Sequence, residues 1–189
     1  MGRDKALVPV GGTAMAARVV AALRAGGCDP VVAVGGDRAA LEALGIDVID
    51  DPWPGEGPLG GVLAALEWAA GSVVVLACDV PWIDAGTVAR LAAHGDHHEG
   101  GELGADDRRD QGLDAVVAHA DGLQPLCARW QPRAIPAVTA AFDAGERSVR
   151  RALAGLRIAT IEVDPALIVD VDNPEDLSAH LPRGGDDQV

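Results

Sequence analysis

The chain has 189 residues, enough for one sizeable domain and too few for two ordinary ones. Hydrophobic residues make up 49% and charged residues 23%, which is a globular composition. The 15 Lys and Arg against 29 Asp and Glu give a formal charge of -14, which argues against a non-specific nucleic-acid binder because such proteins need a basic face. A phosphate-binding protein stays open if a metal ion or a few focused basic groups offset the repulsion.

The sequence also carries signals for the compartment. No apolar stretch is long enough to predict a membrane span, and the N-terminal residues do not have the form of a secretory signal. The three cysteines, Cys28, Cys78 and Cys127, lie far apart and form no CxxC pair. We therefore expect a cytoplasmic protein with no nucleic-acid or membrane partner.

The apolar residues of the first part of the chain alternate between helical and strand periods. Thr13 is expected to cap a helix that runs to Ala25 and stops at Gly26 and Gly27. The pattern then predicts a strand over 30–34, a helix over 38–44 and a strand over 46–49. A loop over 50–57, broken by two prolines, leads into a helix over 58–70.

The strongest strand signal is the run SVVVLAC over 72–78, which is apolar on both faces, as expected for a central parallel strand. A helix over 83–93 and a polar loop over 94–111 follow it. The turn residues Asp121 and Gly122 predict a hairpin between strands over 114–119 and 123–130. The last part predicts helices over 135–144 and 148–154, strands over 157–163 and 168–171, and a helix capped by Asn173.

These elements predict one α/β domain over residues 1–182, followed by a disordered tail over 183–189. We expect a single doubly wound, mostly parallel sheet with helices on both faces, and the hairpin indicates a small antiparallel insertion.

Asp79 is the first candidate for chemistry because it directly follows the apolar run over 72–78. A carboxylate at the carboxyl end of a central strand faces the crevice where open α/β sheets bind ligands. Mg²⁺ takes few protein ligands, so one carboxylate beside phosphates is a usual anchor for it. The alternative is that Asp79 caps the following helix, but Asp84 is the better cap candidate. We therefore interpret Asp79 as a metal ligand.

The segment over 55–61, GEGPLGG, matches GxGxxG by letter. Two prolines separate it from the preceding strand, so it does not fit a dinucleotide-binding fold, and the chain has no P-loop motif. A backbone with little side-chain bulk that enters a helix N-terminus suits the close approach of a base or a phosphate. A simple tight turn is the alternative.

Several charged residues are weaker candidates. Lys5 is the one lysine beside fourteen arginines, and it is either kept for its compact ammonium group or present by chance. Asp170 and Asp172 share one face of a predicted strand, so one of them can join Asp79 at a metal. Capping of the last helix is an equally good interpretation of these two residues. Arg147, Arg150 and Arg151 fit either pairing with Glu146 or an anion site. These three arginines are the last candidates.

Taken together, the motifs resemble the molybdenum cofactor guanylyltransferase family, within the nucleotidyltransferases of doubly wound α/β fold. They extend in family order from the first residue to Leu177, and the GPLGG element points to the guanylyl branch. The matching motifs are MGRDKAL at 1–7, Gly12, IDD at 49–51, GPLGG at 57–61, CDVP at 78–81, QPL at 124–126 and VDVDNPEDL at 169–177.

The resemblance implies that GTP and molybdopterin, with or without bound molybdenum, are the substrates and that Mg²⁺ is the cofactor. It implies catalytic roles for Lys5, which contacts the nucleotide phosphates, and for Asp79, which binds Mg²⁺, with Asp172 as a second metal contact. It also implies that seven residues bind the guanine nucleotide: Lys5, Asp51, Gly57, Pro58, Leu59, Gly60 and Asp79. Molybdoenzyme maturation factors are the partner proteins that such an activity implies.

One departure affects the prediction of activity. The family has a central strand and a glycine-rich loop of the form LAGGxSxRMG ahead of the lysine, and this chain starts at the last two residues of that motif. The resemblance therefore predicts a gap in the middle of the sheet. Cytidylyl transfer to molybdopterin or another phosphorylated acceptor is one alternative, and a non-catalytic nucleotide-binding or partner-binding protein is the other.

Overall fold

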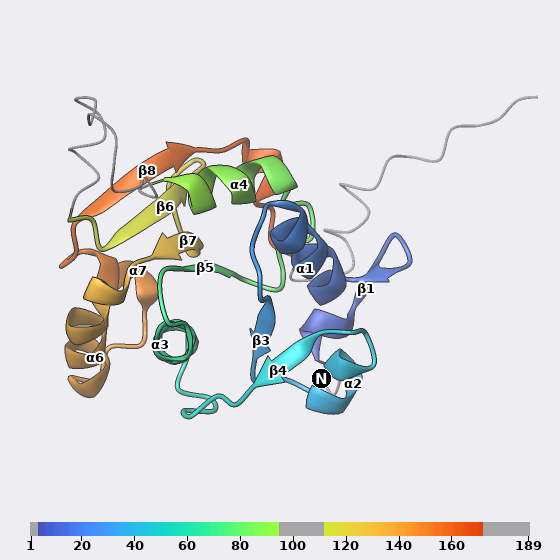
Figure 1. Cartoon of the computed structure of the whole chain (residues 1–189), viewed down its shortest axis with the longest axis horizontal. Helices are drawn as coiled ribbons and strands as arrows, with labels where there is room; N and C mark the ends of the chain where they lie inside the picture. The colour runs from blue at the N-terminus through green and yellow to red at the C-terminus, as the bar shows by residue number, and fades with distance from the viewer. Residues whose placement is uncertain (1–3, 95–111, 172–189) are drawn as a thin grey trace, which may run out of the picture.

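The computed structural model describes residues 4–94 and 112–171 (Figure 1). The strands in this part are β1 Pro9–Val10, β2 Thr13–Ala14, β3 Val32–Val34, β4 Asp47–Ile49, β5 Val73–Leu76, β6 Ala115–His119, β7 Leu123–Trp130 and β8 Ile158–Glu162. The helices are α1 Met15–Ala25, α2 Arg38–Glu42, α3 Pro58–Trp68, α4 Ala85–Ala93, α6 Ile135–Asp143 and α7 Val149–Leu153. Short 3₁₀ helices cover Lys5–Leu7, Pro132–Ala134 and Pro165–Leu167.

The strands form three separate ladders. The largest has the order β5-β7-β6-β8, in which β7 is antiparallel to both neighbours and β6 is parallel to β8. β3 and β4 form a parallel pair, and β1 and β2 a small hairpin. The α/β class is confirmed, as is the hairpin of β6 and β7, whose turn places Asp121 at a φ of 51°. The sheet is more mixed than predicted, because the described neighbour of β5 is the antiparallel β7.

Helices cover both faces of the sheet, as the doubly wound prediction requires. Val74 and Leu76 of β5 pack in a cluster with α1 and α4, whereas Val73 and Val75 pack in a second cluster with α3, α6 and α7. In Figure 1, α4 lies above β5 and α3 lies below it. Since successive strand side chains point to opposite faces, an all-apolar strand such as β5 serves both layers.

The local signals explain where the helices next to the site begin. Asp84 caps α4 by accepting a hydrogen bond from the Thr87 backbone N–H at 2.7 Å. Gly57 precedes α3 with a φ of 85°, a conformation that L side chains rarely adopt, and Pro58 takes the first helical position.

Two local predictions are wrong. Thr13 lies in β2 and does not cap α1, whose N-cap Ala14 makes no side-chain hydrogen bond. Residues 168–171 form no strand: the chain there leaves the 3₁₀ helix over Pro165–Leu167, the Ile168 N–H donates to the Pro165 carbonyl, and the Val171 N–H donates to the Asp79 carbonyl. The predicted cap Asn173 and the tail over 183–189 lie outside the described residues. No helix in the described ranges is long and apolar enough to cross a membrane.

Candidate active site

The two residues with predicted catalytic roles meet in the structure although they lie far apart in the sequence. The Lys5 ammonium Nζ lies 2.9 Å from Asp79 Oδ2, and the side chains are 38% and 26% exposed. Asp79 follows β5, and Lys5 opens a 3₁₀ helix that Asp4 caps through the Ala6 N–H at 3.0 Å. Asp79 therefore has a cationic partner and solvent access. Asp84, not Asp79, caps the next helix, as the sequence predicted.

Asp4 connects this pair to the end of another strand. Its Oδ2 accepts a hydrogen bond from the Asp37 backbone N–H at 3.1 Å, just beyond the Gly35-Gly36 turn that follows β3. The segment Asp4-Lys5 thus touches the chain beyond the carboxyl end of β3 and beyond that of β5. Open α/β sheets bind ligands at such an edge.

The glycine loop and Asp51 lie at the same edge. Asp51, Gly57, Pro58 and Asp79 all line one cavity of about 1060 Å³. Asp51 Oδ1 accepts a hydrogen bond from the Trp53 N–H at 2.9 Å, which fixes the start of the loop. Four of the predicted nucleotide-binding residues therefore line one cavity, and Lys5 joins them through its ion pair with Asp79.

The other two predicted nucleotide contacts are buried. Leu59 is 0% exposed and packs in the core beneath α3. A Cβ built at Gly60 would lie 3.4 Å from the Phe142 ring, so this glycine allows close packing between α3 and α6. The Leu59 side chain and Gly60 therefore support the loop through packing, and their contact with a nucleotide stays a prediction.

Arg147 holds the glycine loop in place, a role the sequence did not identify. Its guanidinium bonds Glu56 in the loop at 2.7 Å, donates to the Phe142 carbonyl at 2.8 Å, and lies 4.1 Å from the centre of the Phe142 ring. A planar group with several donors suits such a bridge. The sequence marked the basic cluster, but its partner in the loop is 91 positions away.

The other two arginines of the cluster have different partners. Arg151 pairs with Glu146 at 2.6 Å, and this bond together with those from the Ser148 and Arg147 N–H groups lowers the pKa of Glu146 to about 2. Arg150 donates to the Leu123 carbonyl at 2.6 Å. The pairing interpretation is therefore confirmed for Arg151 and Glu146.

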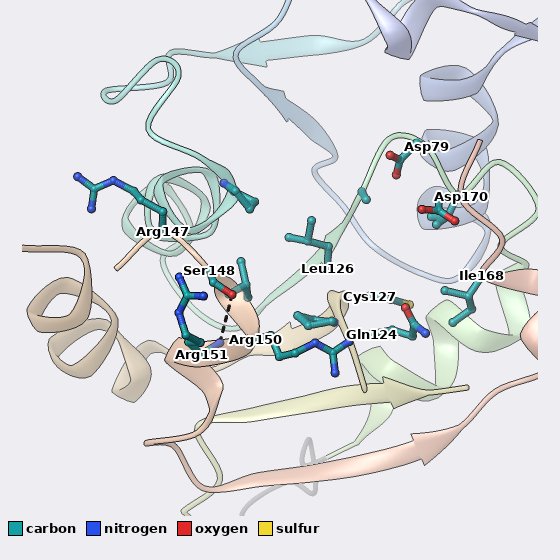
Figure 2. A pocket seen from close by; sticks show the side chains of 15 residues that line it. Asp79, Gln124, Leu126, Cys127, Arg147, Ser148, Arg150, Arg151, Ile168 and Asp170 are labelled. Atoms are coloured by element: carbon teal, nitrogen blue, oxygen red, sulfur yellow. Dashed lines mark hydrogen bonds between the residues drawn. The ribbon is translucent and has the colours of Figure 1, made fainter. Parts of the chain in front are cut away.

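A second cavity, of about 670 Å³, adjoins Asp79 (Figure 2). Asp79 and Asp170 lie at one end of it, Arg147 and Arg151 lie at the other, and Leu126 lies between. The Val171 N–H donates to the Asp79 carbonyl at 2.9 Å, which places Asp170 beside Asp79. Asp172, the predicted second metal contact, lies outside the described residues.

The two cavities share a wall. Pro58, Ala77, Asp79 and Leu126 line both of them. Asp79 is therefore accessible from both cavities. A transfer between two bound substrates needs this arrangement, because alignment supplies much of its rate.

The donor set fits a hard cation that keeps most of its water. Asp79 and Asp170 offer carboxylate oxygens at one end of a cavity, and Mg²⁺ is commonly held by one or two carboxylates together with substrate phosphates. Among residues 4–94 and 112–171, no group of three or more His, Cys, Asp and Glu is placed to form a closed metal cage. The described residues therefore do not form a metal site whose ligands all come from the protein.

A lysine, a carboxylate and a glycine loop at the carboxyl ends of the strands of an α/β sheet are the arrangement in which such proteins bind ligands. The family model described as the MobA-like NTP transferase domain matches residues 1–163. The chain therefore belongs to this family of nucleotidyltransferases.

Relatives agree in sequence and in structure. The chain is 33% identical over 189 residues to the molybdenum cofactor guanylyltransferase of Rhodobacter capsulatus, covering 94% of this chain and 86% of that protein. It is 36% identical over 160 residues to the probable molybdenum cofactor guanylyltransferase of Opitutus terrae, covering 82% and 72%. The crystal structure of molybdopterin-guanine dinucleotide biosynthesis protein A from Archaeoglobus fulgidus shares the fold, with a TM-score of 0.69, 24% identity and coverage of 95% and 89%.

Proposed function

We propose that this protein transfers the guanylyl group of GTP to molybdopterin and releases pyrophosphate. Its family and its named relatives support this reaction. The observation that carries the proposal in this chain is that two cavities meet at Asp79, beside Lys5. A donor nucleotide in one and an acceptor in the other would bring an α-phosphate and an attacking phosphate together.

The donor belongs at the rim of the larger cavity. Asp51, Gly57 and Pro58 lie there, and the bare backbone at Gly57 lets a base or a phosphate approach closely. Arg147 bonds the loop at Glu56 and so keeps this rim in position before the nucleotide arrives. A preformed rim loses less entropy on binding.

Lys5 and Asp79 provide the charge control. Without a nucleotide, the ammonium group and the carboxylate neutralise each other at 2.9 Å. When bound at Asp79, Mg²⁺ would neutralise charge on the phosphates of the donor and the acceptor. Lys5 would then contact the triphosphate in place of Asp79, so that the same two residues would neutralise each other in the empty site and the substrate charge in the filled one. This role depends on a compact cation.

The acceptor belongs in the smaller cavity. Its phosphate would lie near Asp79 and Asp170, and its remaining part would extend past Leu126 towards the arginine end. Arg150 is exposed, lines this cavity and has donors beyond the one that bonds the Leu123 carbonyl. We therefore assign Arg150 to an anionic or carbonyl group of the acceptor. No covalent intermediate with the protein is needed, because the acceptor phosphate itself attacks the α-phosphate and pyrophosphate leaves.

Calorimetric titration with GTP, CTP and ATP in the presence of Mg²⁺ tests the choice of nucleotide. We expect GTP to bind most tightly and the preference to depend on the loop around Gly57. Cytidylyl transfer would replace the proposal if CTP bound better than GTP. Binding of GTP without any pyrophosphate release on addition of molybdopterin would instead identify a non-catalytic nucleotide-binding protein.

A further inference from the structure

The charged side chains of the site lie on three segments that are far apart in the sequence: the Lys5 segment, the turn that contains Asp79, and the segment that contains Asp170. One small apolar cluster joins these segments to helix α1. The cluster comprises Val8 and Val10 beyond Lys5, Met15 in the first turn of α1, Trp82 beyond Asp79, and Val171 beside Asp170. The position of α1 is therefore linked to the positions of all three charged groups.

Helix α1 is attached to the Lys5 segment through its own first residue. The Met15 N–H donates to the Val8 carbonyl at 3.0 Å, and the Met15 side chain is fully buried. The 3₁₀ helix that begins at Lys5 contacts α1, and its Ala6 packs in the same core cluster as Val19 of α1. The start of α1 therefore determines where the Lys5 backbone lies.

The same helix holds the turn of Asp79 through Arg18, one helical turn beyond Met15. The Arg18 Nε–H donates to the Pro81 carbonyl at 2.9 Å, and Pro81 is buried while Arg18 is half-buried. A buried carbonyl that lacks a partner costs free energy, so this bond favours one position of the chain after Asp79. Since proline also restricts the residue before it, little freedom remains between the bond and Asp79.

Two bonds of Asp79 itself depend on the position of this turn. Its carboxylate accepts a hydrogen bond from Lys5 Nζ at 2.9 Å. Its carbonyl accepts one from the Val171 N–H, also at 2.9 Å, which brings Asp170 beside it. A displaced turn would therefore weaken the contacts among all three charged groups at once.

We propose that Arg18 is a positioning residue of the site, which holds the turn of Asp79 where this carboxylate meets Lys5 and Asp170. Arg18 acts through the Pro81 carbonyl and is not among the described residues that line the two cavities. The role rests on the proposed function, because it serves the Mg²⁺ that Asp79 would bind. The effect of Arg18 on the turn itself does not depend on that function.

Two substitutions of equal length separate the hydrogen bond from the rest of the side chain. In Arg18→Gln the amide nitrogen takes the place of Nε and can donate to Pro81, whereas in Arg18→Met a methyl group takes that place. Both remove the charge, and both new residues favour a helix about as well as arginine does. Arg24→Met is the matched control, because Arg24 also donates from α1 to a backbone carbonyl, that of Gly45 at 3.2 Å.

The first measurement is hydrogen exchange of the whole chain without any ligand. The Val171 amide reports the turn because it bonds the Asp79 carbonyl, and the Ala120 amide, which bonds the Gly122 carbonyl, reports a hairpin that opens independently of α1. Arg18→Met should speed exchange at Val171 by about five- to tenfold, the effect of one lost hydrogen bond, and leave Ala120 unchanged. Arg18→Gln and Arg24→Met should resemble the wild type at both amides.

The second measurement is the binding of Mn²⁺, a paramagnetic substitute for Mg²⁺, to the whole chain in the presence of GTP. Asp79→Asn defines the loss of the site. Arg18→Met should weaken Mn²⁺ binding and raise the Mg²⁺ concentration for half-maximal pyrophosphate release, both by about five- to tenfold. Arg18→Gln should restore both values. A merely structural role would lower the thermal midpoint and leave the Mg²⁺ dependence as it is in the wild type.

Three results would overturn the proposal. Exchange at Val171 that is equal in Arg18→Met and the wild type would show that the turn does not depend on Arg18. Exchange that is equally fast in Arg18→Met and Arg18→Gln would show that the bond to Pro81 is not what holds it. Faster exchange with an unchanged Mg²⁺ dependence would show that the carboxylate keeps its place without Arg18. If instead the wild type formed no product from GTP, the proposed function would fail, and exchange at Val171 would still decide whether Arg18 holds the turn.

Discussion

Replacing Asp79 with asparagine changes the charge of the site while keeping nearly the same shape. The amide oxygen that Asp79→Asn introduces can still accept a hydrogen bond from Lys5, whose Nζ lies 2.9 Å from Oδ2 in the wild-type chain. The site loses one negative charge and one ligand for a divalent cation. Two quantities should therefore respond very differently, the free energy of unfolding and the rate of transfer.

The structure sets the size of both effects. The Lys5–Asp79 pair is 38% and 26% exposed, and ion pairs in such surroundings contribute about 0.2–1 kcal/mol. For a chain of this size, that corresponds to a thermal midpoint lower by at most about 4 °C. Loss of one electrostatic contact to a developing charge lowers the rate by about 10²–10³-fold. The rate should therefore fall far more than the stability explains.

Asp84→Asn is the matched control. It removes the same charge five positions along the chain, and Asn caps α4 as well as Asp does. Pyrophosphate release from GTP and molybdopterin is measured across a Mg²⁺ titration, beside a thermal melt of each variant. We expect Asp79→Asn to be slow at every Mg²⁺ concentration and Asp84→Asn to resemble the wild type. Near-normal transfer by Asp79→Asn, or an equal loss in both variants, would refute the metal assignment.

Four more predictions concern other residues at the site and around the glycine loop. Lys5→Arg should slow pyrophosphate release, because the planar guanidinium does not occupy the position of a compact ammonium group. Lys5→Ala should be at least as slow. Equal rates for Lys5→Arg and the wild type would make the lone lysine an accident of composition. Arg147→Lys should raise KM for GTP more than it lowers kcat, since a lysine cannot bridge the glycine loop to α6, and steady-state kinetics over a range of GTP concentrations separate the two effects. In thermal melts, Gly57→Ala should lower the free energy of unfolding by about 1 kcal/mol or more, because alanine disfavours the positive φ at this position. Gly61→Ala should raise it by up to about 1 kcal/mol, because an added Cβ meets nothing within 4 Å. The reverse order would show that the loop is not strained at Gly57. The pKa of Glu146 is lowered to about 2 in the folded protein. The ionised Glu146 side chain therefore stabilises the fold fully above its unfolded-state pKa, and this stabilisation is lost as the pH falls towards 2. The difference in thermal midpoint between the wild type and Glu146→Gln should shrink over that range and stay constant at neutral pH.

The sequence predicted the parts of the site that local pattern determines. The all-apolar run before Asp79 indicated a strand end that faces a ligand crevice, and Asp84 had the better position for a cap. Both features depend on neighbours within a few residues. The α/β class follows from the same alternation of periods, since β5 has apolar side chains for both helix layers.

Contacts between distant parts of the chain were beyond the reach of local pattern. In the sequence, Arg147 is one of three clustered arginines, and its contact with Glu56 forms only in the folded chain. Leu59 lies in a motif associated with nucleotides, but helical register turns its side chain into the core. The prediction of a strand over 168–171 is wrong, because alternating apolar and acidic residues also fit an irregular segment, here bonded to Pro165 and Asp79. Strand pairing partners are likewise not encoded in a local period, so the position of β7 beside β5 was not predicted.

Product analysis by mass spectrometry tests guanylyl transfer itself. The whole chain is incubated with Mg²⁺, molybdopterin and GTP that carries ¹⁵N in the guanine ring, and pyrophosphate is measured in the same sample. We predict a molybdopterin product that carries the labelled GMP unit, with one pyrophosphate released for each product and none formed when Mg²⁺ is removed by a chelator. A molybdopterin product carrying CMP when CTP replaces GTP, or pyrophosphate release that does not depend on molybdopterin, would contradict the assignment.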